Sequence, residues 1–98
     1  MTGRHTPPQA ANVLVVLPSA LLALFPDALP RVEVRAGTVA GMIAALDARW
    51  PGMRNRLCDE TPRIRPHLSI FRNGARAGLD TPLEDGDEIY VLTAMSGG

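Results

Sequence analysis

The sequence predicts one α+β domain, in which one main helix packs on one face of a mixed sheet of four to five strands. Three observations support this prediction. Short segments with alternating apolar and polar residues indicate half-buried strands. One longer segment repeats its apolar residues every three or four positions, as an amphipathic helix does. An Asn73-Gly74 pair between two strand-like segments indicates a tight hairpin.

Length and composition limit the classes of protein to consider. The 98 residues are enough for one hydrophobic core. Apolar residues make up 46% of the chain and charged residues 20%, a globular balance that argues against wholesale disorder. The 10 basic residues, all of them arginine, cancel the 10 acidic residues. Without a basic field to attract polyanions, we expect neither a nucleic-acid partner nor a membrane partner.

The chain carries no recognisable signal for export. Its longest apolar stretch is interrupted at Pro18 and is too short to cross a bilayer. Residues 1–11 lack the apolar centre of a secretory signal. Cys58 is the only cysteine, so an internal disulfide is excluded, in agreement with a reducing compartment. We therefore expect a cytoplasmic protein.

The first third of the chain predicts two strands. Residues 1–11 hold prolines and a glycine without apolar periodicity, so we expect a flexible leader. Residues 12–17 are rich in β-branched residues and predict a buried strand that ends at Pro18. Residues 19–29 are apolar but bounded by prolines, and they predict either one helical turn or a packed loop. Residues 31–35 alternate strictly and predict a half-exposed strand that forms a hairpin with the first.

The main helix follows. Thr38 is a favourable N-cap residue, and Pro51-Gly52 would end the helix. Residues 53–60 predict a further turn, with Leu57 pointing inward. The apolar face of the main helix consists of Val39, Met42, Ile43, Leu46 and Trp50.

The remaining strands come after a loop at residues 61–66. Residues 67–72 alternate, which predicts a strand with Leu68 and Ile70 facing the helix. Residues 75–78 would return across the Asn73-Gly74 turn as a short strand.

A polar loop at residues 81–87 leads into the last predicted strand. Residues 88–92 alternate, so Ile89 and Val91 would point inward. The predicted domain therefore spans residues 12–92.

We expect residues 93–98 to form a flexible tail, which ends in Gly97-Gly98. Two glycines without Cβ atoms form a thin, pliable thread that can enter a narrow channel and present an unhindered carboxylate. An α-carboxylate is ionised at neutral pH and is a poor acyl donor until another protein activates it. Gly98 is the one chemical centre that the sequence supports.

Other reactive constellations are poorly supported. Cys58 and His67 lack a third orienting group, so we interpret them as an incidental thiol and a surface histidine rather than a nucleophile–base pair. One Cys and two His cannot form a zinc set, and no glycine-rich phosphate loop is present. We therefore expect no metal, no bound cofactor and no catalytic activity. The acidic residues of 84–88 are interpreted as a solvated turn, with charge steering toward a basic partner as the alternative.

A docking surface is expected on the open face of the sheet. Alternation places Phe71, Tyr90 and Leu92 outward, where they would form an exposed apolar patch that meets a partner. The alternative is that they are scattered surface hydrophobes. Met95, in the tail, would contact the same partner.

The order of elements resembles the β-grasp fold of the ubiquitin superfamily, and in particular the MoaD/ThiS family of sulfur carriers. These include the small subunit of molybdopterin synthase, the thiamine-biosynthesis carrier and actinobacterial carriers for cysteine synthesis. The resemblance covers residues 12–98. The insert at 19–30 and the connection at 54–66 are longer than in the thiamine carrier. The residues that carry the resemblance are Thr38, Asn73-Gly74, Leu83-Glu84-Asp85-Gly86-Asp87-Glu88-Ile89 and Ser96-Gly97-Gly98.

This resemblance implies a protein co-substrate rather than an enzyme. An adenylating activating enzyme (MoeB/ThiF-like) would use ATP to adenylate Gly98, and a sulfur donor would then convert it to a thiocarboxylate. Met95, Ser96 and Gly97 would thread into the partner. The thiocarboxylate would pass sulfur to a molybdopterin-synthase large subunit, a cysteine synthase or a thiazole synthase.

Two other functions remain open at this point. One is a ubiquitin-like modifier joined to lysines of other proteins; the chain has no lysine of its own, so lysine-linked homopolymers are excluded. The other is a non-covalent β-grasp binding module.

Overall fold

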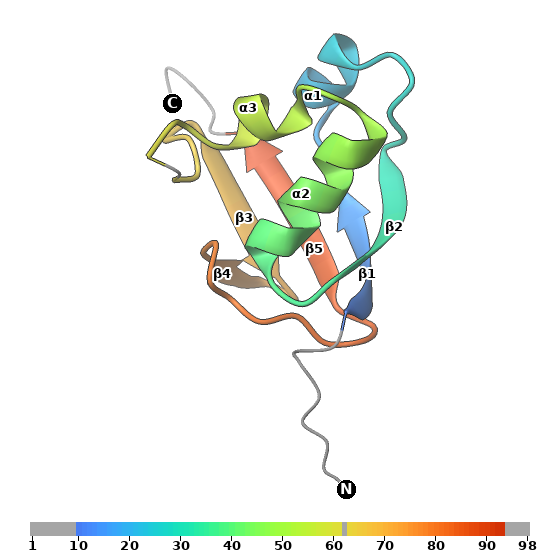
Figure 1. The fold of residues 1–98 in the computed structure, drawn as a ribbon, viewed down its shortest axis with the longest axis vertical. Coiled ribbons are helices and arrows are strands. Elements are labelled where there is room, and N and C mark those ends of the chain that lie inside the picture. Colours follow the sequence, from blue (N-terminus) through green and yellow to red (C-terminus); the bar gives the residue numbers. More distant parts are fainter. Residues whose placement is uncertain (1–9, 62, 94–98) are drawn as a thin grey trace, which may run out of the picture.

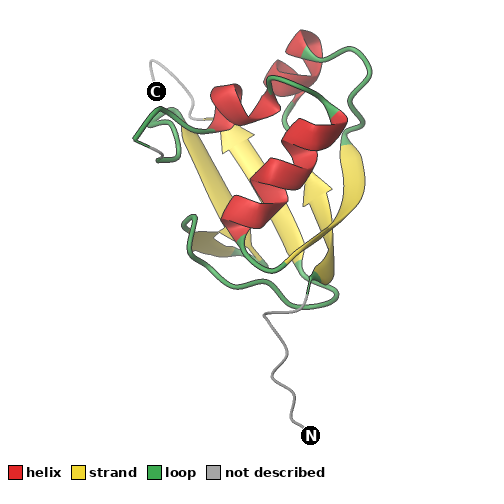
Figure 2. Ribbon diagram, in the orientation of Figure 1, coloured by secondary structure: helices red, strands yellow, loops and turns green. Residues whose placement is uncertain are grey.

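The predicted α+β fold is confirmed. The computed structural model describes residues 10–61 and 63–93. Its five strands form one sheet in the order β2-β1-β5-β3-β4. Helices α2 and α3 lie across one face of that sheet, and α1 lies beyond the end of β1 (Figures 1 and 2). The sheet is mixed because β1 and β5 are parallel whereas the other neighbours are antiparallel. The elements are β1 (Ala11–Val16), α1 (Ser19–Leu24), β2 (Arg31–Ala36), α2 (Val39–Arg49), α3 (Met53–Leu57), β3 (Leu68–Arg72), β4 (Ala75–Ala77) and β5 (Glu88–Thr93).

The hydrophobic core lies between α2 and the sheet. Side chains alternate along each strand, so one side of every strand faces the helix. Leu68, Ile70, Ile89 and Val91 are buried on that side, as predicted. The Thr38 hydroxyl accepts a hydrogen bond from the Gly41 amide at 3.1 Å, which confirms the N-cap. The helix contributes four fully buried side chains, Val39, Met42, Ile43 and Leu46.

Element boundaries differ slightly from the predicted ones. The apolar segment after Pro18 forms a six-residue helix, α1, with Leu21 buried. β1 begins one residue early because Ala11 pairs with Ala36. β5 continues one residue further because Thr93 pairs with Leu68.

The hairpin between β3 and β4 forms as predicted. Asn73 has a φ of 50° and Gly74 a φ of 89°. Two successive residues with positive φ define the tight turn whose twist matches the flanking strands, and Asn-Gly is the pair that adopts it most readily.

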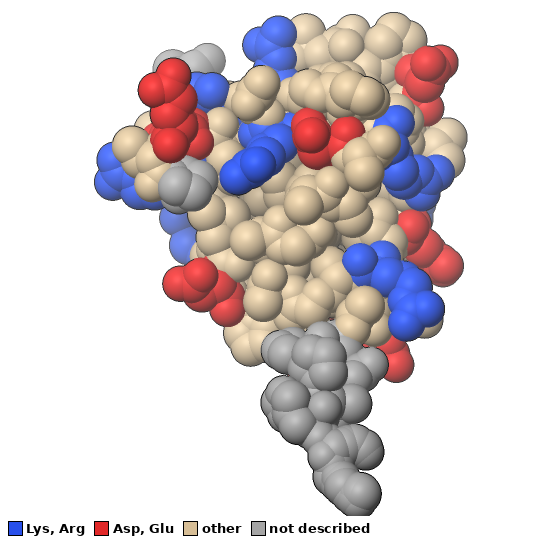
Figure 3. All heavy atoms as spheres, in the orientation of Figure 1, with Lys and Arg blue, Asp and Glu red and all other residues tan. Residues whose placement is uncertain are grey.

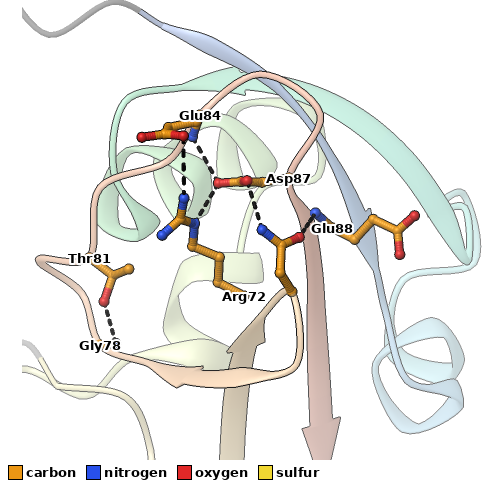
Figure 4. A network of polar contacts seen from close by, with 7 residues as sticks. Arg72, Gly78, Thr81, Glu84, Asp87 and Glu88 are labelled. Carbon is orange, nitrogen blue, oxygen red and sulfur yellow. Dashed lines mark hydrogen bonds and ion pairs between the residues drawn. The ribbon is translucent and has the colours of Figure 1, made fainter.

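Asp87 contradicts the interpretation of the acidic segment as a solvated turn. Only 5% of this residue is exposed. Its carboxylate accepts hydrogen bonds from Arg72 Nε at 2.6 Å, Asn73 Nδ2 at 2.9 Å and the Glu84 amide at 2.8 Å (Figure 4). One buried charge therefore joins the end of β3, the hairpin turn and the loop that enters β5.

A second set of contacts joins the turn before β5, residues 84–87, to β1. The Asp85 carboxylate accepts a hydrogen bond from the Asn12 amide at 2.7 Å, and the Gly86 amide donates to the Asn12 carbonyl at 2.9 Å. Gly86 has a φ of 87°, a backbone conformation that glycine adopts without strain. The start of β5 is thus anchored on both of its neighbouring strands.

We predict that Asp87→Ala lowers the free energy of unfolding by about 2–3 kcal/mol, because it leaves three donors without their shared acceptor. The measurement is urea denaturation followed by circular dichroism. Glu88→Gln is the matched control, because Glu88 is exposed, and it should change stability by less than about 0.5 kcal/mol. Equal effects of the two variants would contradict the structural role of Asp87.

The same network predicts a pH dependence. Burial raises the pKa of Asp87, but hydrogen bonds from Arg72, the Glu84 amide and Asn73 outweigh it, and the net pKa lies below its usual value. A carboxyl whose pKa is lowered by folding stabilises the folded state above its unfolded pKa of about 3.9, and this stabilisation is lost as the pH falls through the folded pKa. As the pH falls below about 5, urea denaturation should therefore show a smaller loss of stability for Asp87→Asn than for the unsubstituted chain.

Candidate functional site

The predicted reactive end of the chain continues directly from the central strand of the sheet. β5 lies between β1 and β3, and its last residue, Thr93, is exposed. Met95, Ser96, Gly97 and Gly98 lie outside the described residues, so their roles stay predictions.

The structure places the three residues of the predicted docking patch on the open face of the sheet. Phe71 and Tyr90 are directly opposite each other on β3 and β5, and Leu92 is opposite Ser69. Phe71 and Tyr90 are partly exposed, and Leu92 is 45% exposed. Directly opposed side chains on one face of a sheet lie close enough to contact each other.

The strand register extends this patch across the whole sheet. Val16 on β1 is paired with Tyr90 on one side and with Arg31 of β2 on the other. On the far side, Phe71 is paired with Arg76 of β4. We call this line of five residues, Arg31, Val16, Tyr90, Phe71 and Arg76, the central row.

The sequence did not identify Val16 as part of this surface. Residues 12–17 are almost entirely apolar, so alternation could not show which side chains of β1 point away from the core. The missing signal was the parallel pairing with β5, a contact between residues far apart in the chain.

Arg76 is held over the patch by two contacts. Its guanidinium carbon lies 5.7 Å from the centre of the Phe71 ring, within the range of a cation–π interaction. Its Nη2 donates a hydrogen bond to Ser69 Oγ at 3.1 Å. The apolar centre of the row is therefore bounded by a cation on each side. The helix-covered face carries acidic and basic side chains interspersed among uncharged residues (Figure 3).

Cys58 and His67 line different cavities. The Cys58 thiol is buried beside Ile43 and Arg54. Burial raises the pKa of this thiol, and Asp59 adds to the effect, although Arg54 and Arg65 oppose it. A buried thiol with a raised pKa is a poor nucleophile, which agrees with the interpretation of Cys58 as incidental.

The described residues offer no other reactive arrangement. Within 10–61 and 63–93, no cluster of three or more His, Cys, Asp or Glu side chains is placed to hold a metal ion. None of the helices that the structure describes is long and apolar enough to cross a membrane.

Known proteins are similar to this chain along most of its length. The sulfur carrier protein CysO of Mycobacterium tuberculosis is 29% identical over 93 residues, which cover 89% of this chain and 99% of the carrier. Small archaeal modifier protein 3 of Haloferax volcanii is 31% identical over 65 residues, which cover 62% of this chain and 70% of the modifier.

A solved structure with the same fold is the complex of BexX and CysO from Amycolatopsis orientalis. One chain of this complex superposes with a TM-score of 0.79 at 27% identity, covering 88% of our chain and 99% of its own length. The sequence profile of the ThiS family matches residues 28–98. Because this match covers well over half of the chain, the protein belongs to the ThiS family.

Proposed function

We propose that this protein is a sulfur carrier whose Gly98 carboxylate is adenylated by an activating enzyme and then converted to a thiocarboxylate. One observation carries the proposal. A single central strand, β5, holds Tyr90 and Leu92 on the open face and continues into the tail. In a complex with a partner bound to the open face, the start of the tail would therefore have a fixed position relative to that partner.

The tail has the reach that this chemistry needs. Five residues separate Thr93 from the end of the sequence, and a fully extended chain spans about 3.3–3.6 Å per residue. The carboxylate can thus enter a partner to a depth of about 17 Å. Gly97 and Gly98 would keep the last part of this thread narrow.

The chemistry itself would take place in the partner. The carboxylate attacks the α-phosphorus of ATP and releases pyrophosphate, which leaves an acyl adenylate. The terminal sulfur of a persulfide then attacks the acyl carbon and AMP leaves. A thiol cleaves the resulting S–S bond, so that the carrier keeps a thiocarboxylate and the thiol forms a disulfide. The carrier supplies the acyl group and the docking surface, and it acts as a co-substrate rather than a catalyst.

The central row supplies the docking surface in this proposal. Aromatic and arginine side chains in the middle of an interface contribute most of the binding free energy. Tyr90 and Phe71 would bury their rings against an apolar partner surface. Arg31 and Arg76, at the two ends of the row, would meet carboxylates of the partner and fix its orientation.

The likeness to CysO favours a sulfur-accepting synthase as the second partner. The likeness to an archaeal modifier protein supports a second candidate function, attachment of Gly98 to lysines of other proteins. The two differ in their stable product. A carrier ends as a free thiocarboxylate, whereas a modifier forms isopeptide conjugates that survive thiol reductants on a denaturing gel.

Incubation with an adenylating enzyme, ATP and a persulfide donor should raise the intact mass by about 16 Da, the difference between sulfur and oxygen. A chain extended by one alanine after Gly98 is the control and should keep its mass. Heavier conjugates with target proteins in place of the 16 Da product would favour the modifier. An unchanged mass with each of several adenylating enzymes of the family would contradict both functions.

The docking surface can be tested by substitution. Phe71→Glu should weaken binding to the activating enzyme roughly ten- to hundredfold, because a charge then replaces an apolar ring in the middle of the row. Ala48→Glu is the matched control, since Ala48 is exposed on α2. Isothermal titration with each folded variant measures the difference. Equal affinities would exclude the central row from the interface.

A further inference from the structure

The cavity that His67 lines lies where β5 ends. It has a volume of about 680 Å³ and is open to solvent between α1, α3 and the start of β3. Thr93, the last described residue before the tail, lines it. The volume is within the range of roughly 300–1,000 Å³ that is typical of sites for small ligands.

The wall of this cavity has an apolar part and a basic part. On the apolar part, α1 and the residue after it provide Leu21, Leu24 and Phe25. Leu24 is 51% exposed, the largest exposure among the big apolar side chains that the structure describes. An occupant with an apolar side chain would cover it.

The basic part is formed by Arg56 of α3 together with Arg65 and His67. Arg65 Nε donates a hydrogen bond to the Asn55 carbonyl at 2.7 Å, which holds this guanidinium at the wall. No carboxylate is among the described residues that line the cavity. The occupant that fits both parts is therefore a short segment with an apolar side chain and a negative charge.

We propose that this cavity binds the last five residues of the chain itself, residues 94–98. In the chain that ends at Gly98, this segment starts at the cavity wall and is long enough to turn back into it. Met95 provides a flexible apolar side chain suited to an irregular apolar wall. The Gly98 carboxylate provides the charge that Arg56 and Arg65 would bind.

The tether makes this binding feasible even when each contact is weak. A ligand joined by a short flexible linker has an effective concentration of the order of millimolar at its site. The tail would therefore rest in the cavity between encounters and leave it when a partner binds. This inference goes beyond the proposed function and does not depend on whether Gly98 is ever activated.

The test compares amide spectra of ¹⁵N-labelled full chain and a chain that stops at Thr93. We expect removal of the tail to shift the amides of Leu21, Leu24, Asn55 and Arg56, and to leave Gly74 in the distant hairpin unchanged. Shifts restricted to Thr93 and its strand neighbours would overturn the proposal. Well-dispersed spectra show in the same experiment that each chain is folded.

Charge reversal on α3 tests the role of the carboxylate. In Arg56→Glu, removal of the tail should no longer shift the amides of α1. Arg54→Glu is the matched control, because Arg54 lies on the same helix but lines a different cavity, and this variant should keep the shifts. The same response in both variants would contradict recognition of the carboxylate by Arg56.

Peptide titration separates the tail from other anions. The peptide Ala-Met-Ser-Gly-Gly, added to the chain that stops at Thr93, should restore the shifts, and its C-terminally amidated form should not. Inorganic phosphate that restores the shifts where the peptide does not would overturn the proposal, since the cavity would then be a general anion site.

Discussion

The parallel pairing of β1 with β5 is the constraint on which the rest of the structure depends. It inserts the last strand of the chain into the middle of the sheet, between the N-terminal strand and β3. Ile89 and Val91 are then buried against the helix, while Tyr90 and Leu92 point to the open face. The segment that leads to Gly98 thus starts from a strand that is hydrogen-bonded on both sides.

The contacts of the turn before β5 explain the residue types in the segment Asp85-Gly86-Asp87-Glu88. The Asp85 carboxylate accepts a hydrogen bond from the backbone of β1, and Gly86 adopts a positive φ. The Asp87 carboxylate accepts hydrogen bonds from β3, the hairpin turn and the loop before β5. Glu88, by contrast, is exposed. This segment is therefore a structural device that fixes where β5 begins, and only through that strand does it affect the tail.

Much of the fold could be predicted from the sequence because the patterns that specify it are local. The periodicity of Val39, Met42, Ile43 and Leu46 is contained within one helix, and the Asn73-Gly74 turn is specified by two adjacent residues. The segment that forms α1 has only six helical residues between prolines, too few for a periodic pattern to separate a helix from a packed loop.

The surface was harder to predict because it is formed by contacts between distant residues. In the sequence, Asp87 cannot be distinguished from an exposed acidic turn residue. Its burial depends on hydrogen bonds from Arg72 and Asn73, which are 15 and 14 positions away in the chain. Val16 joins the central row only through its register with β5. Apart from Asn12, its own strand has apolar residues on both faces, so the alternation within that strand is weak.

We propose that the open face and the tail act together because one strand carries both. The most direct test is the rate of pyrophosphate release by the activating enzyme with ATP and equal concentrations of either the full chain or the peptide Ala-Met-Ser-Gly-Gly. We expect rapid release with the full chain and little release with the peptide, which has the carboxylate but no docking surface. Equal rates would show that the enzyme recognises the tail alone and would rule out a role for the open face.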